Sequence, residues 1–218
     1  MTDARQPAGA LPVATPLGVR RDRVFLTFLV LTFAFAVVFL QHISTLPVQM
    51  ADDGLGARGF GFVISVNAVL IILVTRPVSR RLQRFPTSRV LTVSSIFLGL
   101  GFGATAWAST IPAYLLTVLV WTVGEVIGSS LAPAVVAELA PVQARGRYQG
   151  ALTSTFAVAA LAAPVAGGWV YDGLNAGALW IGCGVLSFAA GAGHLLAGPA
   201  RQRRLEDLRR EVGAPFGC

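Results

Sequence analysis

The stretch "AYLLTVLVWTVGEVIGSSLAPAVVAEL", Ala113 to Leu139, is largely apolar, and its charged residues are two carboxylates, one near its middle and one at its end. About 20 apolar residues, at a rise of about 1.5 Å per residue, cross the hydrocarbon core of a bilayer. Length and composition therefore predict a transmembrane helix. The central carboxylate, Glu125, lies about 12 residues into this helix, or about 18 Å, which is close to the bilayer midplane.

Five more apolar runs of similar length are separated by polar turns. The composition of the whole chain is that of a membrane protein. Of its 218 residues 55% are hydrophobic and 12% are charged, and the mean hydropathy of +0.70 lies outside the range of soluble domains. Frequent Gly and Pro within the runs are ordinary in transmembrane helices and argue against a β-barrel. The sequence predicts an all-α polytopic membrane protein with spans at Val24–Val48, Phe60–Leu82, Val90–Ala108, Ala113–Leu139, Gln149–Val170 and Ala176–Ala197.

The charged residues predict the orientation of these helices. All 17 basic residues are arginines, and with the N-terminus inside only Arg58 among the loop arginines falls on the outer side, beside Asp52, Asp53 and Asp172. The positive-inside rule therefore predicts that both termini are cytoplasmic. We interpret the net charge of +7 as topology and contact with anionic lipid headgroups, and not as nucleic-acid binding.

The two ends differ from the six-helix domain, which we place at residues 24–198. Residues 1–23 are rich in Ala, Pro and Gly, lack the apolar core of a signal peptide, and predict a disordered cytoplasmic lead. Residues 199–218 predict a basic cytoplasmic tail, in which Leu205 and Leu208 at helical spacing indicate a short helix on the inner membrane surface. A solvated, disordered tail is the alternative.

Cysteine spacing and loop composition indicate neither a metal site nor a cofactor site. Of the two cysteines, Cys183 lies inside the sixth span and Cys218 at the extreme end of the chain, so we expect no disulfide between them, and no metal-ligand spacing occurs. Nothing resembles a phosphate-binding loop.

The six helices divide into two sets of three with opposite orientation. The first set enters from the cytoplasm and carries its arginine-rich loop after its second helix, whereas the second set enters from outside and carries such a loop after its first helix. Two inverted three-helix repeats of this kind are an architecture of membrane transporters.

Glu125 is the strongest candidate for a functional residue, because a charge in lipid costs about 2.5–3.5 kcal/mol. It shares one stripe of the helix with Trp121, Ser129 and Pro133 at four-residue spacing. We expect that stripe to face a cavity, where the carboxyl group binds and releases a proton or pairs with a cationic substrate. A glutamate that only ties helices together is the alternative. The neighbouring stripe of small residues, which permits close helix packing, is Gly124, Gly128 and Ala132.

Polar residues on two other helices could line the same pathway. Gln41 and His42 precede Pro47 in the first span, and Asn67 lies in the second. They could form the outer part of a substrate pathway, with Pro47 allowing a bend, or a satisfied hydrogen-bond network between helices. Helix packing and hinge positions in the fifth span are Pro164, Gly167 and Gly168.

Two cytoplasmic loops concentrate charge. Such loops can form charge networks that lock one conformation at the cytoplasmic face, although they could also serve as topology determinants alone. The candidate gating residues are Arg80, Arg81 and Arg84 in "TRPVSRRLQRFPTSR", and Glu138, Arg145 and Arg147 in "ELAPVQARGRYQG".

From about Arg20 to Arg204, these motifs in this order resemble the C-terminal half of a major facilitator superfamily transporter, in particular bacterial drug:proton antiporters. The motifs are "TLPVQM", "RPVSRRLQRF", "WTVGEVI", "RGRYQG" and "APVAGGWVYD". The resemblance implies helices seven to twelve of a twelve-helix plasma-membrane protein that works by alternating access driven by the proton gradient. It also implies that Arg80, Arg81, Arg145, Gly146 and Arg147 belong to gating loops, and that Gln41, Asn67 and Glu125 face the central cavity.

Members of that family have two six-helix bundles, and this sequence has one. We therefore expect either a homodimer, or pairing with a separate N-terminal half, or a truncated gene. The predicted function is the half of a secondary active transporter that exchanges small amphipathic, drug-like compounds for protons. A non-transporting membrane scaffold is the alternative.

An intramembrane serine protease of the rhomboid type is a remote alternative, because such enzymes also have six helices. Ser129 or Ser130 and His194 invite this comparison. No glycine follows the serine to shape an oxyanion site, and His194 lies nearer the inner surface. We therefore expect no enzyme activity.

Overall fold

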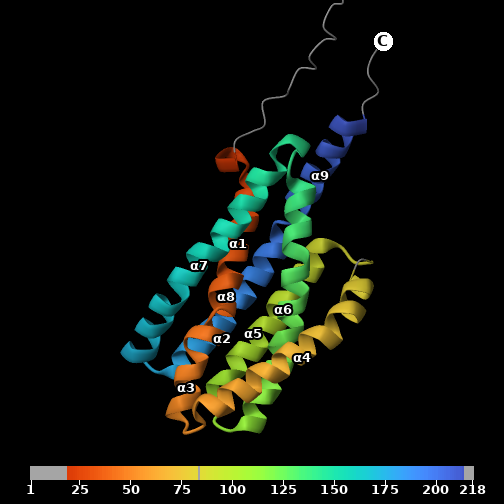
Figure 1. Ribbon diagram of the computed structural model, residues 1–218. Helices are drawn as coiled ribbons and strands as arrows, with labels where there is room; N and C mark the ends of the chain where they lie inside the picture. The colour runs from red at the N-terminus through yellow and green to blue at the C-terminus, as the bar shows by residue number, and fades with distance from the viewer. Residues whose placement is uncertain (1–18, 83, 214–218) are drawn as a thin grey trace, which may run out of the picture.

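Six long helical spans run back and forth between two ends of the molecule in the computed structural model (Figure 1). The structure describes residues 19–82 and 84–213, and within them every regular element is a helix. All six spans are long and apolar enough to cross a membrane, which confirms the all-α polytopic fold. The spans are α1 (Arg23–Phe39), α2 (Gln41–Ser44) and α3 (Leu46–Asp52) together, then α4 (Gly56–Leu82), α5 (Thr87–Ala104), α6 (Ile111–Leu139), α7 (Arg145–Gly173) and α8 (Ala176–Leu196), with α9 (Gly198–Gly213) after the last.

Several helices extend beyond the predicted apolar runs. α4 begins at Gly56 and not at Phe60, and α7 begins at Arg145 and not at Gln149. The apolar pattern marks the part of a helix that lies in hydrocarbon, whereas hydrogen bonding continues the helix into the polar interface. Hydropathy therefore located the spans but not their ends.

The first span is broken into three helices. The breaks fall at Leu40 and Thr45, and Pro47 occupies the first turn of α3. A proline is tolerated in a first turn, where its missing N–H would have no helical partner. The bend expected near Pro47 thus takes the form of two interruptions, and they lie just before the proline.

α5, α6 and α8 form the centre of the bundle, and close backbone contacts explain why. A Cβ on Gly101 of α5 would lie 2.5 Å from the Cβ of Trp121 in α6, and a Cβ on Gly99 would lie 3.1 Å from the carbonyl oxygen of Gly184 in α8. Only glycine permits helices to approach so closely. These contacts bring α6 and α8 against opposite parts of α5.

Two hydrophobic clusters fill the bundle, one toward each end. Toward the end that holds α3, the ring of Phe102 stacks between Trp121 and Trp180, at centroid distances of 5.2 and 5.9 Å. Toward the end that holds α9, Phe25 packs on Tyr148 at 4.3 Å. We call these two ends of the bundle the α3 end and the α9 end (Figure 1).

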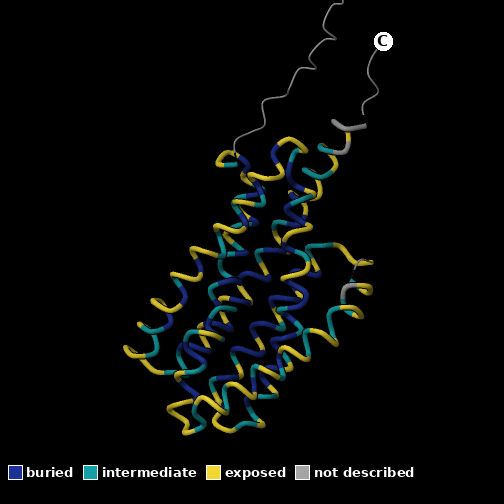
Figure 2. The backbone as a smooth tube through the Cα atoms, in the orientation of Figure 1, coloured by how far each residue is buried: buried dark blue, intermediate teal, exposed yellow. Residues whose placement is uncertain are grey.

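α4 and α7 lie at the periphery and are the least buried spans. Of the residues in their most apolar windows, 11% and 22% are buried, against 56% for α5. Figure 2 shows mostly exposed and intermediate residues along both helices. Apolar faces of this size must be covered by lipid or by protein. Their most exposed large apolar side chains are Phe62, Val69, Ile72 and Leu73 on α4, and Val158, Leu161, Val165 and Trp169 on α7.

At the α3 end, two adjacent aspartates bind tyrosines from different helices. Asp53 accepts a hydrogen bond from the Tyr114 hydroxyl of α6 at 2.5 Å. Asp52 accepts one from the Tyr171 hydroxyl of α7 at 2.7 Å. The end of the first span is therefore fixed to both α6 and α7.

At the α9 end, Asp22 joins three elements. Its carboxylate caps α1 by accepting from the Phe25 backbone N–H at 3.0 Å, accepts from the Tyr148 hydroxyl at 3.0 Å and lies 3.8 Å from the Arg204 guanidinium of α9. The lead was expected to be disordered as far as residue 23, but residues 19–21 form a 3₁₀ turn and Asp22 is buried. Residues 1–18 and 214–218 lie outside the described residues.

Candidate functional site

Glu125 lies midway along α6 and is bound to α4. One of its carboxylate oxygens, Oε2, accepts a hydrogen bond from the Asn67 amide at 3.0 Å. The same amide nitrogen donates to the Thr122 hydroxyl at 2.9 Å, and that hydroxyl donates to the Val118 carbonyl at 2.6 Å. Both amide protons of Asn67 are thus used, which fixes the orientation of its side chain.

The second carboxylate oxygen of Glu125 is available for another partner. Within residues 19–82 and 84–213, no hydrogen bond involves Oε1, and the residue is partly exposed. The burial along its stripe changes steadily, because Trp121 is buried in the cluster at the α3 end, whereas Ser129 and Pro133 are exposed. Glu125 therefore lies where the stripe leaves the core, and it can accept a proton or a cation there.

The neighbouring stripe of α6, which carries the small residues, packs directly on α5 and α1. A Cβ on Gly124 would lie 2.6 Å from the Leu98 backbone nitrogen of α5, and the Ser94 hydroxyl donates to the Gly124 carbonyl at 2.7 Å. A Cβ on Gly128 would lie 2.6 Å from the Phe35 ring of α1. The close contacts of these two glycines hold α6 in the rotation that turns Glu125 toward α4.

Gln41 lies in a different hydrogen-bond network, between the first span and α7. Its amide donates to the Ala163 carbonyl at 3.0 Å, and its oxygen accepts from Thr45 at 2.7 Å and from Ser44 at 3.1 Å. It is buried, and a side chain on Gly167 would collide with it. The structure does not bring Gln41 to Glu125.

The other two predicted pathway residues, His42 and Ser129, lie near Glu125 along α6, and no hydrogen bond of the described residues joins them to its carboxylate. The His42 ring lies 5.6 Å from the Trp121 ring, one turn before Glu125, and its Nδ1 lies 2.5 Å from the Phe39 carbonyl oxygen. The Ser129 hydroxyl donates to the Glu125 carbonyl at 2.7 Å. Of the five predicted pathway residues, Asn67 and Glu125 alone are joined by a hydrogen bond between two side chains among the described contacts.

The candidate gating residues all lie on the surface. Among the described residues the one ion pair is Arg204 with Asp22, so the structure shows no salt bridge between the two charged loops. The exposed residues are Arg80, Arg81, Arg84, Glu138, Arg145 and Arg147.

The three hinge candidates of α7 have different surroundings. Pro164 is exposed within the helix, and a Cβ on Gly168 would meet no atom within 4 Å. Gly167 is buried against Gln41. Only Gly167 therefore makes the close contact typical of a packing glycine.

Ser129 and His194, which invited comparison with a serine protease, hydrogen-bond to different partners. Ser129 is bound to its own helix, and His194 Nδ1 lies 3.4 Å from the Arg201 guanidinium. No hydrogen bond among the described residues joins a serine to His194, and no three His, Cys, Asp or Glu side chains of residues 19–82 and 84–213 form a metal-binding group.

Sequence reasoning missed three contributors to these networks. Thr122 directly follows Trp121 of the Glu125 stripe, and its hydroxyl could have been identified as a partner for a polar side chain of a neighbouring span. Asp22 stands directly before an apolar run, which is the signal of a helix cap. Nothing in the sequence marked Arg201 as buried, because it belongs to a tail of five arginines.

Comparisons with known proteins identify the family of the chain. Residues 24–217 match the Major Facilitator Superfamily. The chain is 25% identical over 162 residues to a "Na(+), Li(+), K(+)/H(+) antiporter" of Planococcus maritimus, covering 67% of this chain and 38% of that protein. It is 24% identical over 157 residues to multidrug resistance protein MdtH of Edwardsiella ictaluri, covering 72% and 39%.

A third relative is the uncharacterized MFS-type transporter YqjV of Bacillus subtilis, 25% identical over 136 residues, with 61% of this chain and 33% of that protein covered. The chain thus spans about two fifths or less of the length of the curated relatives it matches. Because the family match covers nearly the whole chain, this polytopic membrane protein belongs to the major facilitator superfamily.

Proposed function

We propose that this chain forms one half of a secondary active transporter, in which Glu125 binds the transported proton or cation. The observation that carries the proposal is the Asn67–Glu125 hydrogen bond, which holds a carboxylate midway along a membrane span and leaves one of its oxygens available. Burying an ionisable group at this depth costs free energy, and such groups therefore mark functional sites in membrane proteins. The site can exchange protons for cations because one carboxylate cannot hold both at once.

A second six-helix bundle completes the pathway in this proposal. The peripheral helices α4 and α7 carry large exposed apolar faces, and the curated relatives are more than twice as long as their matched regions. Another bundle, either a second copy of this chain or a separate N-terminal half, would cover part of those faces and enclose Glu125. A lone bundle would leave the open oxygen of Glu125 facing lipid.

Two substrate classes fit a carboxylate site. Small amphipathic or drug-like cations agree with the relatives named for multidrug resistance, and alkali metal cations agree with the relative named as a sodium, lithium and potassium antiporter. We favour amphipathic compounds, moved out of the cell in exchange for protons, because the apolar aromatic cluster at the α3 end begins at Trp121, one turn from the carboxylate.

The proposal also assigns roles to the remaining candidates. Both termini lie on the cytoplasmic side of the plasma membrane, because the arginine clusters follow the positive-inside rule. The exposed arginines of the two cytoplasmic loops open and close the inner gate by pairing with acidic groups in one state only. α7 bends at Pro164, whose missing N–H weakens the helix there.

The test is exchange in proteoliposomes that hold the assembled protein. A pH gradient is imposed and its collapse is followed with acridine orange after addition of ethidium or of Na⁺. We expect one of the two cations to collapse the gradient, and Glu125→Gln to slow this exchange at least 10-fold. The matched control is Glu206→Gln, a surface carboxylate on α9, which should retain the wild-type rate.

Three outcomes would contradict parts of the proposal. Undiminished exchange by Glu125→Gln would remove the role of the carboxylate. Full exchange activity by a strictly monomeric chain would show that transport needs no second bundle. Exchange of neither ethidium nor Na⁺ in a properly folded sample would contradict both substrate classes.

A further inference from the structure

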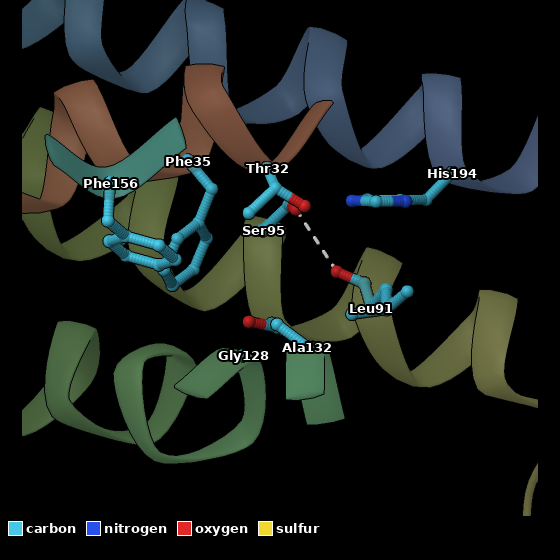
Figure 3. Close-up of a pocket in the computed structure, with 9 residues that line it drawn as sticks. Thr32, Phe35, Leu91, Ser95, Gly128, Ala132, Phe156 and His194 are labelled. Atoms are coloured by element: carbon cyan, nitrogen blue, oxygen red, sulfur yellow. Dashed lines mark hydrogen bonds between the residues drawn. The ribbon is translucent and has the colours of Figure 1, made fainter. Parts of the chain in front are cut away.

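A small cavity lies among α1, α5, α6, α7 and α8, separate from Glu125 (Figure 3), and its lining is mainly apolar with a group of polar side chains. Its volume is about 20 Å³ for the centre of a water-sized sphere, and about 10–15 Å³ by that measure suffices for one water molecule. Its polar lining comes from Thr32, Ser94, Ser95 and His194, each of which is buried. The cavity therefore combines the size of one water with polar side chains that can hydrogen-bond to it.

The three hydroxyl groups have already used their protons. Thr32 donates to the Phe28 carbonyl at 2.8 Å, and Ser95 donates to the Leu91 carbonyl at 3.0 Å, the contact drawn in Figure 3. Ser94 donates to the Gly124 carbonyl. Each hydroxyl oxygen can therefore only accept a hydrogen bond from the cavity.

His194 supplies the complementary donor. Its ring points into the cavity toward the hydroxyls of Thr32 and Ser95 (Figure 3). Its Nδ1 lies 3.4 Å from an Arg201 guanidinium nitrogen, and because a guanidinium only donates, Nδ1 must be the unprotonated acceptor. The ring proton is therefore on Nε2, which has no hydrogen-bond partner among the residues described and faces the cavity.

We propose that the cavity is a binding site for a single water molecule, held between the imidazole of His194 and the hydroxyls of Thr32 and Ser95. The water accepts one hydrogen bond from Nε2–H and donates one to each hydroxyl oxygen. Three hydrogen bonds are typical of a buried water. The Nε2–H group of His194 then has an acceptor, and both protons of the water have acceptors in the hydroxyl oxygens of Thr32 and Ser95.

The bound water joins the two inverted repeats in the core. Thr32 and Ser95 belong to the first three spans, and His194 belongs to the last. Beside the Thr92 hydroxyl, which donates to the Gly191 carbonyl at 2.9 Å, the water provides a second polar contact between α5 and α8. The site is independent of transport through Glu125.

Nuclear magnetic resonance of the full chain in lipid nanodiscs tests the site. The chain has two histidines, so ¹⁵N-histidine labelling gives two rings, and the signals lost in His42→Gln assign the other ring to His194. Near neutral pH we expect His194 as the neutral Nε2–H form, with a magnetisation-transfer peak from water to that ring. In Ser95→Ala combined with Thr32→Val, we expect loss of this peak, since the water has lost both acceptors.

The matched control is Ser65→Ala on α4, a hydroxyl bound to its own helix and remote from the cavity lining. It should leave the water peak intact. Unchanged His42 signals in every cavity variant show that the protein is folded. A charged or Nδ1–H ring at His194, or a wild-type ring without contact to water, would overturn the proposal, as would a water peak that survives the double substitution.

Discussion

Asn67 of α4 and Glu125 of α6, which are 58 residues apart in sequence, meet at 3.0 Å within the described bundle. The amide of Asn67 holds the carboxylate with one proton and the Thr122 hydroxyl with the other. α4 has few other buried residues, since only 11% of its apolar window is buried. This hydrogen bond therefore both orients Glu125 and fixes the position of a peripheral helix.

Loss of the amide should destabilise the bundle and release α4. We expect Asn67→Ala to lower the free energy of unfolding by about 1–3 kcal/mol, because the buried Thr122 hydroxyl and the partly buried Glu125 carboxylate lose their donor. A double-mutant cycle with Glu125→Ala should give a coupling energy of about 1 kcal/mol. The measurement is thermal unfolding followed by a thiol-reactive dye in a Cys218→Ser background, where the buried Cys183 reacts only on unfolding. A coupling energy of zero would mean that the contact contributes nothing.

The glycine at the α5–α6 contact should not tolerate a side chain. A Cβ at Gly124 meets backbone atoms at 2.6 Å, which cannot move without displacing the helix, so Gly124→Ala should cost about 1–3 kcal/mol. Gly168→Ala is the matched control, because its Cβ meets no atom and alanine favours the helix. The thiol assay should show a lower melting temperature for the first variant only. Equal melting temperatures would refute close packing at Gly124.

Asp22 should stabilise the α9 end through its cap and its tyrosine contact. We expect Asp22→Ala to cost about 1–3 kcal/mol, because the variant loses the cap of α1 and leaves the Tyr148 hydroxyl unpaired. Arg204→Gln should cost less than about 1 kcal/mol, since its ion pair with Asp22 spans 3.8 Å at a partly exposed site. Chemical denaturation monitored by tryptophan fluorescence can rank the two variants. The reverse order would show that the ion pair dominates.

The buried cation Arg201 should be replaceable by an apolar side chain. It has no carboxylate within 4 Å among the described residues, its Nε is unpaired, and burial lowers the pKa of its guanidinium. A base whose pKa is lower in the folded state destabilises that state wherever the unfolded chain holds the proton, so this cost applies throughout the range from about pH 5 to pH 9.

Arg201→Met should therefore leave the protein at least as stable as the wild type at each of these pH values. The methionine keeps contact with Phe28, over whose ring the guanidinium now lies at 5.4 Å. Arg203→Met, at an exposed position of the same helix, is the control. A loss of more than about 2 kcal/mol in Arg201→Met, measured by the same denaturation, would mean that the cation stabilises the fold.

Hydropathy and charge sufficed to predict the six spans and the all-α class, because each apolar run must cross the bilayer by itself. Partner choice between spans depends instead on a few side chains. The sequence indicated that Glu125 lies near the midplane and Asn67 in the outer part of its span. It did not indicate that they bind each other, because depth leaves the rotation of each helix undetermined.

Rotation also separates Gln41 from the residues with which it was grouped. Gln41 and His42 are adjacent in sequence, yet one binds the backbone of α7 and the other lies beside Trp121. A break at Leu40 resets the helix before them. Such a break has no clear sequence signal, since the nearest proline comes several residues later.

The adjacent aspartates at the α3 end determine how far the first span is rotated about its own axis. Successive residues of a helix point about 100° apart, and Asp52 and Asp53 use this angle to reach Tyr171 and Tyr114 on two different helices. An inserted or deleted residue before them would turn both carboxylates away from both hydroxyls at once. Both hydrogen bonds can therefore form only when the first span has its present length, so the two aspartates make correct packing of the bundle depend on that length.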